Sequence, residues 1–503
     1  MTTTPRPVAE QATSAPGGNA DNAELAALGY DPKFKREMSL WANFAIGFAY
    51  LSPVVGIYVT FAIALGTGGP PMIWTLVIAG VGQMLVALVF GEIVSQFPVA
   101  GGIYPWARRL WGRKYAWMTG WVYIFALFAT LSANSYGAGP YLSALLGIDY
   151  SVHASIILAI GLMTVATFTN FLGTKVLSAV AKFGFVTELI GALVVGTWLL
   201  VSSRHHGLDV LFDTHGVADG RNYIAAFLAA GLIGVYQYYG FEACGDVAEE
   251  VPDPSRRIPK TMRMTIYVGG GAAIFVCLAL ILAVTDFAAV ISGENTDPIN
   301  GILAESFGPI GSKVVLVVVL VSFFACILSL QAAASRLLFA YARDNMIMGS
   351  HLLQRFNERL GIPTAAIVVT GTIPCLLVLI ALISEDGLFK IVSFATAGIY
   401  IGFQMVVLAA LRARSKGWVP SGPFTLGKWG WAVNIGALAW GVGAITNMMW
   451  PRSPGAAWYD NYLVFLAAAA VFALGGIYMV ISGRAEESSG PYSDAIPMAA
   501  SSK

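Results

Sequence analysis

Long apolar runs recur along almost the whole chain and are separated by short polar segments. A helix needs about 20 apolar residues to cross a bilayer, and twelve runs reach that length. These runs lie at about 40–66, 72–95, 116–145, 152–172, 178–202, 222–245, 264–288, 311–341, 364–383, 388–411, 431–450 and 459–482. The pattern predicts an all-α polytopic membrane protein with twelve transmembrane helices.

Two of these runs are interrupted in corresponding halves of the chain. Residues 52–56 of the first run read Ser-Pro-Val-Val-Gly, and residues 240–245 of the sixth read Gly-Phe-Glu-Ala-Cys-Gly. Irregular main chain at membrane depth is tolerated only where it is buried in protein or lines a cavity. A matched pair of interrupted spans therefore points to the substrate site of a secondary transporter. The alternative is a simple kink at Pro53 and a tolerated Gly240.

Discontinuous first and sixth helices predict a site built largely from main-chain groups. The second half of the first helix would present N–H groups that favour a carboxylate, and the first half of the sixth would expose carbonyls that suit an ammonium. Aromatic side chains beside the second break could cover a substrate or contact a cation, although they could equally be packing residues. The predicted substrate-binding residues are Ser52, Val54, Val55, Gly56, Ile57, Asn134, Tyr236, Tyr239, Gly240 and Phe241.

Two carboxyl groups fall inside apolar runs and are candidates for proton coupling. Glu242 lies within the second break, and Glu188 lies in the middle of the fifth run. An acid inside the membrane is a functional candidate by default, and burial favours its neutral form, so it could bind and release a proton. Two other readings of Glu188 stay open. It could be the counter-charge of a cationic substrate, or Lys182 could neutralise it.

Charge and composition indicate that the chain is a membrane protein. Of its 503 residues, 57% are hydrophobic and 11% are charged, and the net charge of +1 gives no support for a nucleic-acid partner. Basic residues gather after the second, sixth, eighth and tenth runs, which places both termini in the cytoplasm and predicts a multi-pass protein of the cell membrane. We expect disordered cytoplasmic tails at 1–36 and 484–503, flanking a transporter domain at 37–483.

The residues of metal and enzyme sites do not form recognisable patterns in this sequence. The four cysteines lie in apolar runs without metal-ligand spacing, and the five histidines lie at the edges of spans or outside them. We therefore expect no metal, no cofactor and no catalytic residues.

Four landmarks carry a resemblance to a known family. They are the acid, Phe-Pro and Gly-Gly-x-Tyr of residues 91–104, Gly120-Trp121, the Gly-Phe-Glu break with its Pro/Arg loop at 240–259, and Ser335-Arg336 with Ala342-Arg343-Asp344. Because these landmarks occur in the same order in the amino acid–polyamine–organocation (APC) superfamily, the chain resembles that superfamily, most closely its amino acid/choline transporter (GABA permease-like) branch. The resemblance implies a LeuT-like fold, in which spans 1–5 and 6–10 form a 5+5 inverted repeat and two extra helices follow. It also favours Tyr236 or Phe241 as a gate.

The expected function is uptake of a small amino acid or amine such as GABA, a neutral amino acid, choline, ethanolamine or a polyamine. We expect protons to drive it by alternating access. A substrate/product exchanger with the same fold is the alternative. A channel would be expected to contain a filter motif, and a receptor would be expected to contain extended soluble sensing regions. Neither feature is found in the sequence. An intramembrane enzyme would need a nucleophile–base pair, which we do not find.

Overall fold

The computed structural model describes residues 18–217, 220, 222–382, 387–452, 455–488 and 490–497. Within these residues the regular structure is helical, apart from one isolated bridge between Asn357 and Ile362. Eleven helical segments of the described part of the chain are long and apolar enough to cross a membrane. This confirms the predicted all-α polytopic fold. Where we predicted the sixth span, the structure has a shorter apolar segment, Tyr223–Gln237, so the count of twelve stays a prediction.

The helices have the following bounds: α1 Gly18–Ala27, α2 Leu40–Leu51, α3 Pro53–Gly68, α4 Ile73–Gln96, α5 Ile103–Leu110, α6 Arg113–Gly137, α7 Gly139–Leu146, α8 Val152–Asn170, α9 Thr174–Ser202, α10 Tyr223–Ala230, α11 Leu232–Gln237, α12 Ala243–Asp246, α13 Pro254–Met264, α14 Gly270–Ala283, α15 Phe287–Ile291, α16 Pro298–Arg343, α17 Ser350–Leu353, α18 Thr364–Val378, α19 Gly387–Ser415, α20 Gly430–Met449, α21 Trp458–Asn461, α22 Leu463–Ser482 and α23 Arg484–Glu487. Short 3-10 or π turns join some of them: η1 Pro70–Met72, η2 Leu208–Phe212, η3 Ala248–Glu250, η4 Thr265–Gly269, η5 Leu379–Leu382 and η6 Gly427–Trp429.

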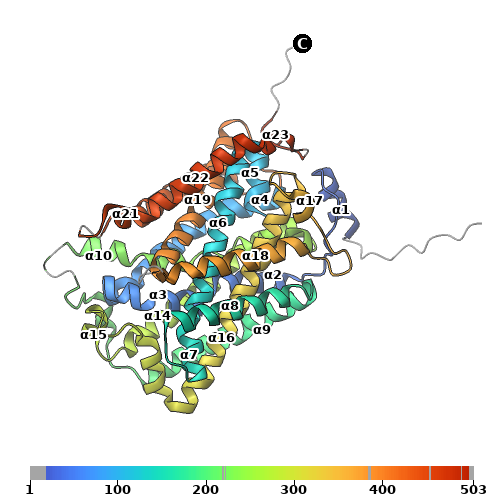
Figure 1. Cartoon of the computed structure of the whole chain (residues 1–503). Coiled ribbons are helices and arrows are strands. Elements are labelled where there is room, and N and C mark those ends of the chain that lie inside the picture. The colour runs from blue at the N-terminus through green and yellow to red at the C-terminus, as the bar shows by residue number, and fades with distance from the viewer. Residues whose placement is uncertain are drawn as a thin grey trace, which may run out of the picture.

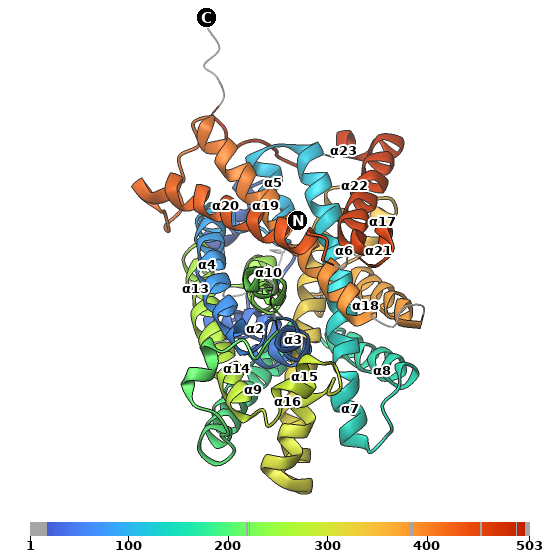
Figure 2. The same ribbon diagram turned by 90° about the vertical axis from the view of Figure 1, so that its left-hand side faces the viewer.

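The interrupted helices lie inside the bundle (Figure 1). Figure 2 looks along α10, which lies near the middle, with α3 below it, α4 on one side and α6 on the other. Helix α11 continues this core and packs against α3 and α4. By contrast, α22 lies at the outer edge, and only 11% of its most apolar window is buried. The bundle therefore surrounds the two breaks with protein.

The first break lies at Ser52, between α2 and α3. Ser52 has φ 37° and ψ 96°, which no helix contains, and Pro53 follows as the first residue of α3. Proline has no N–H to continue the ladder, and its ring clashes with the preceding turn. The Ser52 side chain accepts from the Val55 N–H and so caps the new helix.

The second break lies between α11 and α12, at residues 238–242. Gly240 has φ 107°, a conformation that only glycine adopts without strain. A Cβ at this position would lie 2.5 Å from the Leu51 nitrogen. The main chains of the two breaks are therefore in direct contact.

The segment before α2 differs from the disordered tail that we expected. Residues 18–27 form α1, and Leu25, Tyr30 and Phe34 are buried. The Tyr30 hydroxyl donates to Asp344 at 3.1 Å. These three apolar anchors are spaced too far apart to stand out in a polar segment, yet each one finds a site on the bundle. Residues 1–17 lie outside the described residues.

The segment after α22 also contains order that the sequence did not reveal. Helix α23 follows directly, and residues 490–497 lie against the end of α5. Ser493 N donates to the Arg108 carbonyl at 2.9 Å, and Asp494 pairs with Arg109. Residues 498–503 of the predicted tail lie outside the described residues, and the outer limits of both tails stay predictions.

Candidate functional site

The N-terminus of α3 is occupied by the carboxylate of Glu188, from α9. Ser52 Oγ donates to Glu188 Oε1 at 2.6 Å, and Val54 N donates to the same oxygen at 2.9 Å. The next two donors are also used, because Val55 N reaches Ser52 Oγ and Gly56 N reaches the Ser52 carbonyl. Of the N–H groups that we expected to hold a substrate carboxylate, Val54 N thus binds a carboxylate of the protein itself, and Val55 N and Gly56 N bind Ser52.

Glu188 is fully buried and only half satisfied. Its Oε2 has no hydrogen-bond partner among the described residues. Lys182, the partner considered from the sequence, is exposed, and no ion pair between it and Glu188 occurs in the described part of the chain. A negative charge on the Glu188 carboxylate is therefore stabilised by the α3 dipole and by two hydrogen-bond donors rather than by a cation.

The second break is held by its own acid. Gly240 N donates to Glu242 Oε2 at 2.7 Å, and Tyr123 Oη of α6 donates to Oε1 at 2.8 Å. Both oxygens of Glu242 are thus used, and the side chain is fully buried. Glu242 keeps the loop at 238–242 in shape by bonding a donor that the helix has released.

Gln237 joins the two breaks and was missed in the sequence. Its Nε2 donates to the Leu51 carbonyl at 3.2 Å and to the Ser52 carbonyl at 3.4 Å. Gly56 makes room for it, since a Cβ there would lie 2.2 Å from Gln237 Oε1. An amide in an otherwise apolar segment directly before a break was the available signal.

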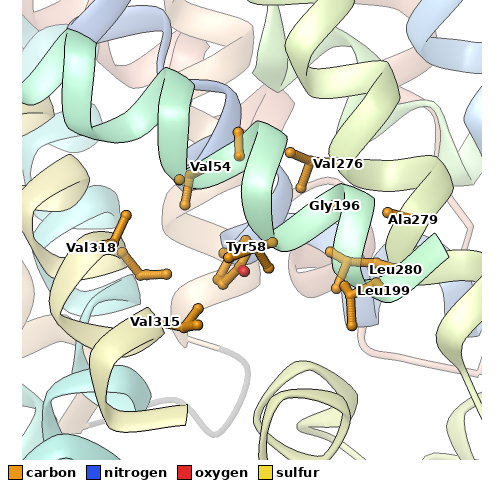
Figure 3. Close-up of a pocket in the computed structure, with 13 residues that line it drawn as sticks. Val54, Tyr58, Gly196, Leu199, Val276, Ala279, Leu280, Val315 and Val318 are labelled. Atoms are coloured by element: carbon orange, nitrogen blue, oxygen red, sulfur yellow. The ribbon is translucent and has the colours of Figure 1, made fainter. Parts of the chain in front are cut away.

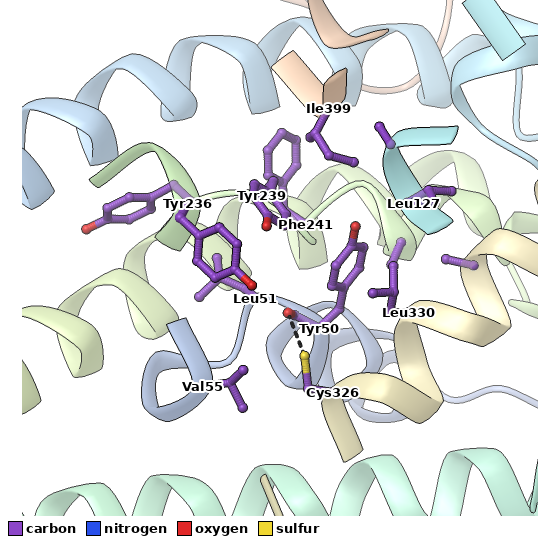
Figure 4. Packing of buried hydrophobic residues seen from close by; sticks show 14 of the residues in the cluster. Tyr50, Leu51, Val55, Leu127, Tyr236, Tyr239, Phe241, Cys326, Leu330 and Ile399 are labelled. Atoms are coloured by element: carbon purple, nitrogen blue, oxygen red, sulfur yellow. Dashed lines mark hydrogen bonds between the residues drawn. The ribbon is translucent and has the colours of Figure 1, made fainter. Parts of the chain in front are cut away.

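A chain of polar contacts runs beside the breaks, and Figure 4 shows its last contact, between Cys326 and Tyr50. Tyr236 Oη donates to Asn134 Oδ1, Asn134 Nδ2 donates to Cys326 Sγ at 3.3 Å, and that thiol donates to the Tyr50 carbonyl at 3.3 Å. The Tyr239 ring lies edge-on to Tyr236, with centroids 5.3 Å apart. The structure therefore brings Asn134, Tyr236 and Tyr239 together at the site.

Two predicted residues face elsewhere or serve mainly as packing. Phe241 packs against Phe90 and Phe403, with ring centroids 5.9 and 5.5 Å away. Ile57 is fully buried in α3. Phe241 thus belongs to a packing cluster with α4 and α19, and the expectation that Tyr236 or Phe241 is a gate stays a prediction.

Two hollows approach this region. A small cavity of about 20 Å³ beside α3 is lined by aliphatic residues and Tyr58, and Val54 forms part of its wall (Figure 3). Its walls offer little to a zwitterion. A larger hollow of about 1130 Å³, here named the vestibule, lies at the far end of α3 near Thr67 and includes Asn222, Asn447 and Arg452.

The opposite end, where α2 begins, is closed by buried ion pairs, here named the charged cluster. Arg336 pairs with Glu250 at 2.8 Å, Arg343 with Glu249 at 3.0 Å, and Arg108 with Asp344. Separating a buried pair is costly, because each charge is left uncompensated.

Tyr30 adds to the charged cluster from the segment before α2. Burial, reinforced by the neighbouring Asp344 carboxylate, raises the pKa of Tyr30 to about 12. Tyr30 therefore stays a neutral donor to Asp344 at physiological pH. The ion pairs of the charged cluster are thus buried, and the vestibule is hollow.

Comparison with known proteins identifies the family of the chain. The family model described as "Amino acid permease" matches residues 38–476. The chain is 28% identical to "Amino-acid permease BAT1" of Arabidopsis thaliana, covering 84% of this chain and 87% of that protein. It is 28% identical to the BAT1 homolog of rice, covering 88% and 89%. It is 26% identical to "Amino-acid permease 2" of Neurospora crassa, covering 86% and 82%. The chain belongs to the amino acid permease family of the APC superfamily, and is a multi-pass membrane transporter of amino acids.

Proposed function

We propose that this protein takes up a small amino acid or amine together with protons by alternating access. The substrate would lie between the two breaks, enter from the vestibule and leave past the charged cluster. The sorting of basic residues supports a cell-membrane protein with the charged cluster and both termini in the cytoplasm. The 5+5 inverted repeat and the GABA permease-like branch are part of this proposal.

The observation that carries the proposal is the position of Glu188. Its carboxylate holds the donors at the α3 N-terminus, Val54 N and Ser52 Oγ, which are the groups that an amino acid carboxylate would need. An ionised Glu188 therefore competes with the substrate carboxylate for one place.

Competition of this kind links proton binding to substrate binding. When Glu188 takes up a proton, it loses its charge and binds Val54 N more weakly, and the donors become available. The substrate carboxylate then replaces the Glu188 carboxylate at the helix terminus. Loss of the proton on the other side restores the Glu188 contact and expels the substrate. One proton and one amino acid move together.

A substrate without a carboxylate would behave differently. An amine does not need Val54 N, and it gains from an ionised Glu188 whose Oε2 has no partner among the described residues. We therefore expect amino acids to bind more tightly as the pH falls, and amines to bind more tightly as it rises.

An exchanger would use the same site and is the second candidate. It requires only that the empty carrier reorient slowly, so that one substrate leaves as another enters. The hydrogen bonds of Glu188 with Ser52 and of Glu242 with Tyr123 are compatible with this behaviour.

Two experiments test the proposal. A thermal-shift screen of the purified protein against GABA, alanine, choline, ethanolamine and putrescine identifies ligands, since a ligand that binds the native state raises its melting temperature. Counterflow in proteoliposomes then separates a carrier from a channel. Trans-stimulated uptake supports the proposal, and its absence for all five compounds contradicts it. Accumulation driven by an inward proton gradient distinguishes symport from exchange.

A further inference from the structure

Asp246 is the most anomalous acid in the described structure. It lies at the end of α12, is fully buried, and neither of its carboxyl oxygens has a hydrogen-bond partner in the described residues. Each of the other fully buried acids beside α12 has a donor or a cation. Glu242 has two donors, Glu249 has Arg343, and Glu250 has Arg336.

Asp246 lies between the second break and the charged cluster. Asp246 N donates to the Glu242 carbonyl at 3.1 Å, so the two acids lie one helical turn apart. Glu249 and Glu250 follow within the next turn. Four acids therefore descend from the substrate region towards the charged cluster, and Asp246 is the unsatisfied one among them.

The turn after α4 covers Asp246. Gly101 N donates to the Asp246 carbonyl at 3.0 Å, and a Cβ on Gly102 would lie 2.6 Å from Asp246 Oδ1. Gly102 has φ 39°, so the absence of a side chain here serves both the backbone and the room for the carboxyl. The cover contributes no charged side chain of its own.

The groups facing Asp246 leave it without a counter-charge. Glu242 acts on it from the preceding turn, and Tyr50 of α2 and Tyr123 of α6 lie within electrostatic reach. From α16 comes Arg336, whose guanidinium is engaged by Glu250. Helix α13 presents the uncharged Met262 to this segment. A buried carboxylate without a cation or donor is costly, so this environment favours the neutral acid.

We propose that Asp246 is a second proton-carrying residue, on the exit route of the proton that Glu188 binds: Glu242 passes that proton on, and Asp246 takes it and delivers it on the side of the charged cluster. The inference rests on the proposed function. In the transfer, the O–H bond of the Glu242 carboxyl breaks and one forms on Asp246. The Glu242 carboxylate that remains is held by Gly240 N and Tyr123 Oη. When the charged cluster opens, water reaches Asp246 and solvates its carboxylate. The ionised form is then stable, and the proton passes to water.

The test is Asp246→Asn in proteoliposomes, with the labelled compound among GABA, alanine, choline, ethanolamine and putrescine that the wild type exchanges. We expect counterflow without a gradient to stay comparable to wild type and proton-driven accumulation to be lost. Proton entry, followed with a trapped pH dye, should be lost with it. Asp209→Asn, an exposed acid of η2, is the matched control and should change neither. Asp246→Ser repeats the test with a smaller side chain.

Each outcome is decisive. Wild-type accumulation in Asp246→Asn overturns the inference, as does loss of counterflow and accumulation together in both folded variants, because Asp246 would then serve binding. Failure of both variants to fold assigns Asp246 a structural role and also overturns it. Accumulation that is driven by a sodium gradient and is lost in Asp246→Asn would show that Asp246 binds sodium, and it would overturn the inference that Asp246 carries a proton. Absence of counterflow in the wild type rejects the proposed function itself.

Discussion

The two breaks are held open in different ways. At the first break, the released donors are bound by Glu188, which comes from α9 and lies 136 residues away in sequence. At the second break, the released Gly240 N is bound by Glu242, two residues away. The first acid has a free oxygen and the second has none among the described residues.

This difference separates a movable contact from a fixed one. Glu188 can leave Val54 N without changing the path of its own backbone, because it belongs to another helix. Glu242 cannot release Gly240 N without loosening the loop at 238–242. We infer that the first break is where proton and substrate compete, and that the second mainly keeps its shape while a proton passes.

Substituting each acid by its amide should give the largest effects and tell the breaks apart. Glu188→Gln keeps an oxygen for Ser52 and Val54 and places its NH₂ where no partner is lost, so the melting temperature should change little. Proton-driven accumulation should be abolished and counterflow retained. Unchanged accumulation at equal expression would reject the coupling role of Glu188.

Glu242→Gln should lose accumulation and also stability. Its NH₂ would face either Tyr123 Oη or Gly240 N, both of which donate in the wild type, and a mismatched buried group costs about 1–3 kcal/mol. The melting temperature should therefore fall below that of Glu188→Gln. Equal melting temperatures of the two variants would show that the second break is as movable as the first.

A methyl group placed in each break should have the next largest effect. Gly240→Ala meets the Leu51 backbone and adopts an unfavourable φ, which costs about 1–3 kcal/mol from the φ alone. Gly56→Ala meets the end of the Gln237 side chain, which can move. Thermal unfolding in detergent should rank wild type, Gly56→Ala and Gly240→Ala in falling order. The reverse order of the two variants would contradict the contact between the breaks.

Removing the hydroxyl group that donates to Glu188 or to Glu242 should have a moderate effect on stability and on substrate affinity. Ser52→Ala loses a bond to Glu188 and the cap of α3, which together are worth about 1–2 kcal/mol. Tyr123→Phe loses one bond to Glu242, worth about 1–1.5 kcal/mol. We expect Ser52→Ala to change the pH dependence of substrate affinity more than Tyr123→Phe does, measured by ligand titration at several pH values. An equal change in both would remove the distinction between the breaks.

The smallest effect is expected at Cys326. Its thiol is a weak donor and acceptor that joins Asn134 to Tyr50, and Cys326→Ser preserves both contacts with a stronger group. The melting temperature and uptake should stay near wild type. A large loss of uptake, measured beside Cys277→Ser as a control, would show that Cys326 contacts the substrate directly.

The sequence could predict the breaks because their causes are local. Pro53 and Gly240 act within a few residues, and the apolar runs indicate directly which segments are apolar enough to cross a membrane. The partners of Glu188, the bridge made by Gln237 and the isolation of Asp246 depend on contacts between distant helices, which periodicity does not encode. The folded segment at 18–36 was missed because three anchors, Leu25, Tyr30 and Phe34, lie in an otherwise polar stretch.

The most direct test of the central claim is a cryo-electron microscopy map of the protein in nanodiscs with its exchanged substrate. The account predicts density for the substrate between Ser52–Gly56 and residues 238–242, with Glu188 displaced from Val54 N when the substrate has a carboxylate. Substrate density confined to the vestibule or to the aliphatic cavity beside α3, with the Glu188 contact intact in an amino acid complex, would contradict it.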